Sequence, residues 1–251
     1  MKPLAPRFLA AIAVCVVAFA CGSVPTFADG IAFISPLQRP ALAVAFNDTL
    51  RDSLGRVAPL RVFAFNDHED TLPGVTPSFV VITLPPGVKI DANGIVTAFD
   101  SIRRVQIVGR VGDRLQTEAT NLDVVAQPDL MVQTGTIAPL ALAVNSSPLQ
   151  VTITGDRRGT RVPVSGVIVR YKIIATFPSV PITSDRFLFT EGLRSDLTTS
   201  LDTTDAGSTS RMILASDITG IDSIVVEATA KNLKGVPLTP VRFVIPIKKS
   251  P

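Results

Sequence analysis

Alternation of apolar and polar residues dominates the chain after about residue 40, and no stretch there keeps a helical period. Such alternation, rich in β-branched residues, predicts strands with one buried face, because successive side chains of a strand point to opposite faces. The predicted strands of the first half are 41–46, 60–66, 79–84, 95–99, 105–111 and 115–125. Those of the second half are 149–154, 168–174, 224–228 and 236–247. The predicted fold class is therefore all-β.

A tight turn at Asn93-Gly94 gives the clearest local signal. Asn and Gly tolerate positive φ best, so the pair predicts a type I′ turn with Asn93 and Gly94 as its central residues. The expected hairpin pairs 88–90 with 95–98. A hairpin alone cannot bury its apolar face, so neighbouring strands must complete a β-sandwich around it.

Length and turn residues divide the rest of the chain. About 100 residues suit one sandwich, which predicts two in tandem, at 41–127 and 128–251, with the boundary at Gln127-Pro128. In the second sandwich, Asp205-Ala206-Gly207 predicts a turn in which Gly207 is the structural residue. Residues 21–40, rich in Pro and Gly, are expected to form a tether, within which residues 31–34 are an alternative first strand.

The first 20 residues are typical of a helical secretory signal peptide. Lys2 and Arg7 precede an apolar run, 8–20, that is too short for a comfortable membrane span. Residues 18–21, Ala-Phe-Ala-Cys, resemble a bacterial lipobox with Cys21 as the lipidated residue. Ordinary cleavage after Ala20 or Ala28 is the alternative. Cleavage with lipidation of Cys21 anchors the protein by lipid to the outer membrane or cell surface. Ordinary cleavage at either position releases a periplasmic or secreted protein.

The net charge and the few aromatic and histidine residues exclude some classes of function. The net charge of +3 includes two positive residues of the leader, and the chain has one Tyr, no Trp and no basic stripe, so no nucleic-acid partner is expected. His68 is the only histidine, so histidine-based catalysis or a zinc site lacks partners, and no enzyme activity is expected.

Calcium is the one cofactor that the carboxylates suggest. Asp67, Glu69 and Asp70 could supply oxygen ligands in the first sandwich, and Asp202 and Asp205 could do so in the second. The alternative is that these residues form turns by capping their own backbone.

Two motifs resemble bacterial Ig-like domains. Val88-Lys89-Ile90-Asp91-Ala92-Asn93-Gly94-Ile95-Val96-Thr97-Ala98, with Asp52-Ser53-Leu54-Gly55 upstream, resembles the signature of group 2 over residues 41–125. Thr204-Asp205-Ala206-Gly207 and the strand 224–228 resemble the end of invasin-type group 1 domains over residues 130–247. The resemblance implies tandem Ig-like sandwiches in a non-enzymatic structural, adhesive or display module of the cell envelope. A soluble binding module for a polysaccharide or a protein is the alternative.

Overall fold

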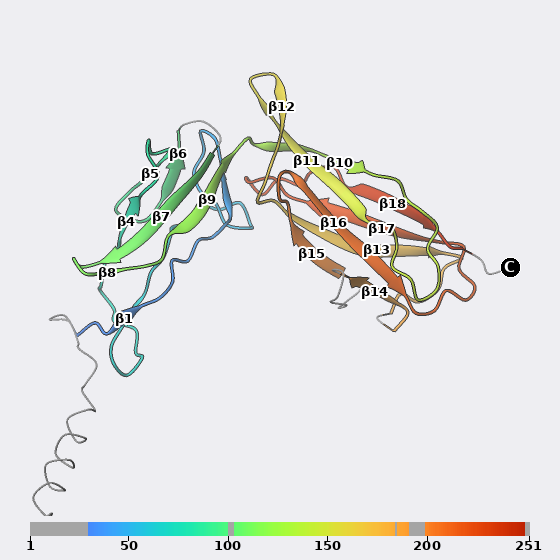
Figure 1. Cartoon of the computed structure of the whole chain (residues 1–251), viewed down its shortest axis with the longest axis horizontal. Helices are drawn as coiled ribbons and strands as arrows, with labels where there is room; N and C mark the ends of the chain where they lie inside the picture. The colour runs from blue at the N-terminus through green and yellow to red at the C-terminus, as the bar shows by residue number, and fades with distance from the viewer. Residues whose placement is uncertain (1–29, 100–102, 184, 191–198, 249–251) are drawn as a thin grey trace, which may run out of the picture. The chain divides into compact units, whose positions relative to one another are not determined.

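The computed structural model describes residues 30–99, 103–183, 185–190 and 199–248, and these residues form strands, turns and loops without a helix (Figure 1). The strands of the first half are β1 (Phe33–Ile34), β2 (Ala43–Ala45), β3 (Ala64–Phe65), β4 (Ser78–Val81), β5 (Val88–Ile90), β6 (Val96–Ala98), β7 (Arg103–Val111), β8 (Leu115–Gln116) and β9 (Thr120–Val125). Those of the second half are β10 (Pro128–Thr134), β11 (Leu149–Arg157), β12 (Thr160–Pro163), β13 (Ile168–Phe177), β14 (Phe187–Thr190), β15 (Thr199–Thr203), β16 (Ser208–Ala215), β17 (Ser223–Ala230) and β18 (Val241–Pro246). The all-β prediction is confirmed.

Strands β10 to β18 form two antiparallel sheets that enclose one core. One sheet has the order β10-β11-β16-β14, with β12 added to β11, and the other has the order β15-β13-β17-β18. In chain order these strands fall into the A-B-E-D and C-F-G sheets of an immunoglobulin constant-type domain, with β12 and β15 as additions. The predicted Ig-like β-sandwich is therefore confirmed by the strand order itself.

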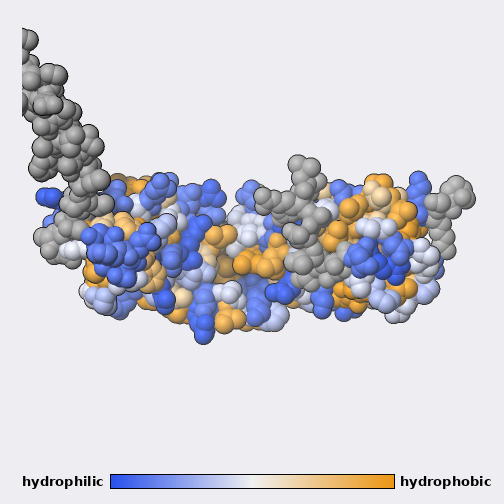
Figure 2. All heavy atoms as spheres, turned by 90° about the horizontal axis from the view of Figure 1, so that it is seen from below, coloured by the Kyte–Doolittle hydropathy of each residue, from blue (hydrophilic) through white to orange (hydrophobic). Residues whose placement is uncertain are grey.

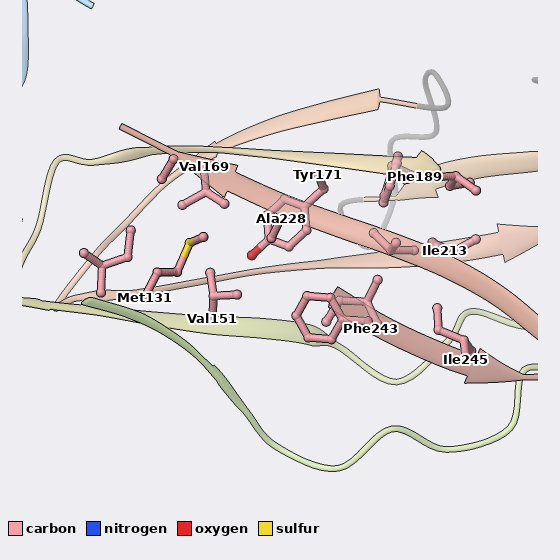
Figure 3. Packing of buried hydrophobic residues seen from close by; sticks show 14 of the residues in the cluster. Met131, Val151, Val169, Tyr171, Phe189, Ile213, Ala228, Phe243 and Ile245 are labelled. Atoms are coloured by element: carbon pink, nitrogen blue, oxygen red, sulfur yellow. The ribbon is translucent and has the colours of Figure 1, made fainter. Parts of the chain in front are cut away.

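Alternating side chains fill this core, as the sequence pattern predicted. Along β16 every second residue is buried, and along β13 Val169, Tyr171 and Ile173 are buried while Arg170 and Lys172 are exposed. Figure 3 shows the side chains of both sheets meeting around Tyr171, whose ring lies 6.4 Å from that of Phe189. The Tyr171 hydroxyl donates a hydrogen bond to the carbonyl of Thr209 at 3.1 Å. Burial raises the pKa of this phenol above its usual value.

Strands β1 to β9 form three further sheets. The largest has the order β2-β9-β7-β4, with β8 added to β7, and β2 runs parallel to β9. The other two are the β1–β3 and β5–β6 ribbons. Long predicted strands are thus interrupted: residues 115–125 divide into β8 and β9, and 60–66 retain only two residues of regular strand.

The chain separates into two compact units. The described residues of the first belong to 1–38, 61–78 and 109–118, and those of the second to 39–60, 79–108 and 119–251. Residues 31–38, which the sequence assigned to a tether, form hydrogen bonds with residues 61–65 and place Ile31 and Leu37 in the interior. The boundaries at 40/41 and 127/128 stay a prediction, although β9 ends at Val125 and β10 begins at Pro128.

The hairpin at Asn93-Gly94 is confirmed, but the predicted type I′ turn is wrong. Val88 pairs with Ala98 and Ile90 with Val96, and only Gly94 has a positive φ, of 80°. The loop is longer because Asp91 spans it: its Oδ1 accepts the N–H groups of Asn93 and Ile95. This bonding produces a type I turn followed by a residue in the left-handed region.

Two-residue turns with both central φ angles positive occur elsewhere. One joins β11 to β12 at Arg158-Gly159, where φ is 53° and 82°, and that hairpin rises out of its sheet in Figure 1. The other is Ala206-Gly207, where φ is 46° and 82°. A Cβ atom on Gly207 would lie 2.4 Å from the Cβ of Pro163, so the position excludes any larger residue.

Candidate binding surface

Three phenylalanines line one face of the β1–β3 ribbon. Phe33 lies opposite Phe65, and Phe63 precedes Phe65 by two residues, so the three share a face. Phe33 is 43% exposed and Phe63 is 37% exposed, whereas Val62 and Ala64 on the opposite face are buried. The ribbon therefore buries its small aliphatic residues and presents its aromatic ones. We call Phe33, Phe63 and Phe65 the aromatic face.

The rings and the backbone of this face are held in place. The rings of Phe33 and Phe65 stack with their centroids 5.0 Å apart and their planes 12° apart. Ser35 bonds Phe63 twice, because its N–H donates to the Phe63 carbonyl at 2.8 Å and its Oγ accepts the Phe63 N–H at 3.0 Å. The N–H of Ala32 donates to the Phe65 carbonyl at 2.8 Å. The face is thus organised before any partner arrives.

An acidic loop, residues 66–70, directly follows β3. Oδ1 of Asn66 accepts the N–H groups of His68 and Asp70 at 3.0 and 2.8 Å, and the Asn66 N–H donates to the Asp70 carbonyl. Glu69 lies in the left-handed region with φ 65°. Its backbone N–H donates to the carbonyl of Asn66, which closes the turn.

The same loop geometry recurs three times in the described chain. Asp52, Asp91 and Asn232 each accept two backbone N–H groups, from the second and fourth residues after them. In these loops the left-handed position is occupied by Gly55, Gly94 and Gly235. The backbone N–H of Arg56 lowers the pKa of the Asp52 carboxyl below its usual range. Glu69 is the member of this set in which a side chain stands where the other three have glycine.

The structure gives two of the three candidate calcium ligands of the first half, Asp67 and Asp70, partners from the protein. In the first half, Asp67 Oδ1 lies 2.7 Å from Nδ1 of His68, and Asp70 Oδ2 accepts from the Asn66 amide. His68 is exposed. Within the described ranges, no three His, Cys, Asp or Glu side chains gather in an arrangement that could hold a metal ion.

The second pair of carboxylates plays separate roles. Asp202 Oδ2 lies 2.6 Å from Nη1 of Arg211 and accepts the Thr209 hydroxyl, and its Oδ1 accepts the Thr203 N–H. Asp205 pairs with Ser208 through both backbone hydrogen bonds of the turn. The alternative from the sequence, turn formation, therefore describes Asp205, while Asp202 belongs to an ion pair at the rim of the core. Calcium binding itself stays a prediction.

The aromatic face was missed by sequence reasoning. Its signal was the alternation of Val62, Phe63, Ala64 and Phe65, which indicates a strand but does not say whether the large or the small residues are buried. Figure 2 shows apolar patches between hydrophilic ones on the side of the molecule that it displays. Cys21 and the leader lie outside the described residues. In the part of the chain that is described, no helix has the length and apolarity needed to cross a bilayer.

Comparisons with known proteins add no family. No protein-family model matches the chain, and no curated protein matches it. Among solved structures, it is similar to the Yersinia pseudotuberculosis adhesin InvE at 14% identity, with a TM-score of 0.35 and coverage of 89% of this chain. The chain spans 62% of that InvE structure. Similar matches are domains 4 and 5 of the S-layer protein SbsC (12% identity, TM-score 0.33, 86% and 99% of the two chains) and the D0-D1 domain of intimin (14%, 0.25, 84% and 98%). TM-scores below 0.5 carry no argument, so the Ig-like assignment rests on the strand order described above.

Proposed function

We propose that this chain is an exported, non-enzymatic Ig-like protein of the cell envelope. It is anchored through a lipid on Cys21 and acts as a structural or adhesive module that displays a binding surface. The single observation that supports this role is the aromatic face. Large apolar side chains that gather in water on a rigid scaffold mark interaction sites, because their burial by a partner is favourable.

The geometry of the face favours a protein partner. The Phe33 and Phe65 rings cover one face of each other, which leaves less flat ring surface for a sugar to stack on. Aromatic side chains with few rotatable bonds are typical anchors of protein interfaces, since little conformational entropy is lost when they are buried. The acidic loop beside them, with Asp67 and Glu69, would add charge selectivity at the rim of the contact.

The proposed anchor limits where the partner can be. Phe33 is the twelfth residue after Cys21, and at no more than about 3.6 Å per residue the chain between them spans at most about 40 Å. The aromatic face would therefore remain within roughly that distance of the membrane carrying the lipid. A component of the same envelope is the expected partner.

A matched pair of double variants tests the role of the face. Phe33→Ser/Phe63→Ser removes the two exposed rings. The control, Leu54→Ser/Val236→Ser, removes two apolar side chains elsewhere that are more exposed, at 61% and 55%. We expect cross-linking in intact envelopes to join the wild type and the control to a protein partner. The Phe variant should give at least tenfold less of the cross-linked product than the wild type, while its circular dichroism spectrum remains that of a β protein. Equal cross-linking by all three proteins would refute the proposed surface.

A further inference from the structure

Strand β4 leaves one edge of its sheet open. It is the last strand in the order β2-β9-β7-β4, so among the described strands its only neighbour in the sheet is β7. Phe79, Val80 and Val81 are partly exposed and Ile82 is 44% exposed. The stretch 71–88 contains no Asp, Glu, Lys or Arg. Natural sheets usually block a free edge with charge or a bulge, because an open edge pairs with other strands.

The direction of the free hydrogen-bonding groups follows from one contact. The N–H of Ile82 donates to the carbonyl of Gln106 on β7 at 2.9 Å. Backbone groups alternate along a strand, so those of Val80 also point toward β7. The N–H and C=O groups of Phe79 and Val81 consequently point to the open edge.

We propose that β4 pairs antiparallel with β4 of a second copy of this chain, with Val80 opposite Val80. The outward groups belong to Phe79 and Val81, so a two-fold axis must pass through a residue rather than between residues. An axis at Val80 places Phe79 opposite Val81, and these pairs exchange both of their hydrogen bonds. It also places Ser78 opposite Ile82, and the pairing ends before Pro77 would meet Thr83.

The neighbouring registers fit less well. An axis at Phe79 would oppose Pro77, which lacks an N–H, to Val81. An axis at Val81 would need the outward backbone of Thr83, but β4 ends at Val81 and the Thr83 hydroxyl already accepts the Gln106 N–H at 2.8 Å. Self-complementarity of the short strand is what identifies the occupant as a second copy, since a two-fold interface uses the same patch on both subunits.

Cysteine placement tests the register directly. In the proposed dimer the Val80 residues form a non-hydrogen-bonded pair with Cα atoms about 4.5 Å apart, which is within the range that a disulfide bridges. Ile82→Cys is the matched control, because the two Ile82 residues would lie four residues apart along the strand, roughly 13 Å. Both changes are made in the full chain carrying Cys15→Ala and Cys21→Ser, which removes the native thiols.

We expect Val80→Cys to form disulfide dimers at least tenfold more than Ile82→Cys under mild oxidation. Adding Val81→Pro should abolish them, because proline removes an outward N–H while leaving the bonds to β7 intact. Equal dimer formation by both cysteines would overturn the proposal, as would dimers that persist with Val81→Pro. A disulfide to a different protein in place of the homodimer would also overturn it.

A measurement without cysteine guards against misfolding of the variants. Sedimentation of the Cys15→Ala/Cys21→Ser chain should show dimers that increase with concentration, and Val81→Pro should remain monomeric with an unchanged circular dichroism spectrum. A chain that is monomeric at every concentration would contradict the pairing. The dimer uses neither Cys21 nor the aromatic face, so its failure would leave the proposed function standing.

Discussion

Removing the Asp202 carboxylate should destabilise the second sandwich. The carboxylate pairs with Arg211 and accepts hydrogen bonds from the Thr209 hydroxyl and the Thr203 backbone. The Arg211 side chain is only 7% exposed. Asp202→Ala would remove this carboxylate from beside a guanidinium that lies in a place that water barely reaches.

The size of the effect follows from the burial of the two partners. Breaking a fully buried ion pair costs about 3–5 kcal/mol. Here the Asp202 side chain is 26% exposed, and Arg211 keeps hydrogen bonds to Ser200 Oγ and to the Leu201 and Ser210 carbonyls. We therefore expect a loss of about 2 kcal/mol, or about a 30-fold increase in the unfolded fraction of this sandwich.

Tyr171 allows the unfolding of the second sandwich to be followed separately. It is the only Tyr in a chain without Trp, it lies in this core, and its hydroxyl bonds the Thr209 carbonyl. In urea unfolding followed by tyrosine fluorescence, the midpoint of Asp202→Ala should be about 1 M below that of the wild type, if the free energy of unfolding falls by about 2 kcal/mol per M of urea. Asp129→Ala, which breaks an ion pair with Arg161 whose side chains are 42% and 53% exposed, should cost no more than about 0.5 kcal/mol. Equal midpoints for Asp202→Ala and Asp129→Ala would refute the reasoning. A loss that appears only when calcium is present would point to a metal role for Asp202 instead.

Three further predictions concern turns and pH. Glu69→Gly should stabilise the fold by about 0.5–1 kcal/mol in thermal unfolding, because Gly relieves the left-handed conformation of this position; a lower melting temperature would contradict this. Gly94→Ala should lower the free energy of unfolding by about 2–4 kcal/mol, because its Cβ would lie 2.8 Å from the Leu60 carbonyl oxygen. Gly74→Ala, at a similar φ but in open space, should lower it by only about 1 kcal/mol, and equal losses would show that the contact with Leu60 has no effect. The Tyr171 phenol has a raised pKa in the fold, so the unfolded chain ionises first and stability that is complete below about pH 10 should fall as the pH rises further. Tyrosinate absorbance that rises near pH 10 before unfolding would argue against the buried phenol.

Much of the fold was predictable because the strands follow from the local alternation of apolar and polar residues. The pattern around Arg170, Tyr171 and Lys172 identifies a central strand and its buried face, and the structure bears out both. Gly207 was predictable because a short turn between strands requires positive φ. The hairpin at Asn93-Gly94 was found for the same reason, but its turn type depended on a side chain, Asp91, that bonds two backbone N–H groups across the loop.

The candidate surface was less predictable for a physical reason. Alternation shows that two faces differ, but which face is buried depends on the strands that pack against it. In the β1–β3 ribbon the small residues, Val62 and Ala64, are buried, and the aromatic ones are not. Gly109 contributes to this choice, since a Cβ there would lie 2.6 Å from Cγ2 of Val62. Contacts between segments this far apart in sequence cannot be read from either segment alone.

The most direct test of the envelope role is the intact mass of the protein exported with its own leader, compared with Cys21→Ser. The account predicts a wild-type chain that begins at Cys21, carries acyl chains and sediments with the membrane, and a variant that lacks the acyl mass and stays in the soluble fraction. A wild-type mass that begins at Cys21 or at Asp29 without lipid would contradict the anchor and leave a soluble exported protein.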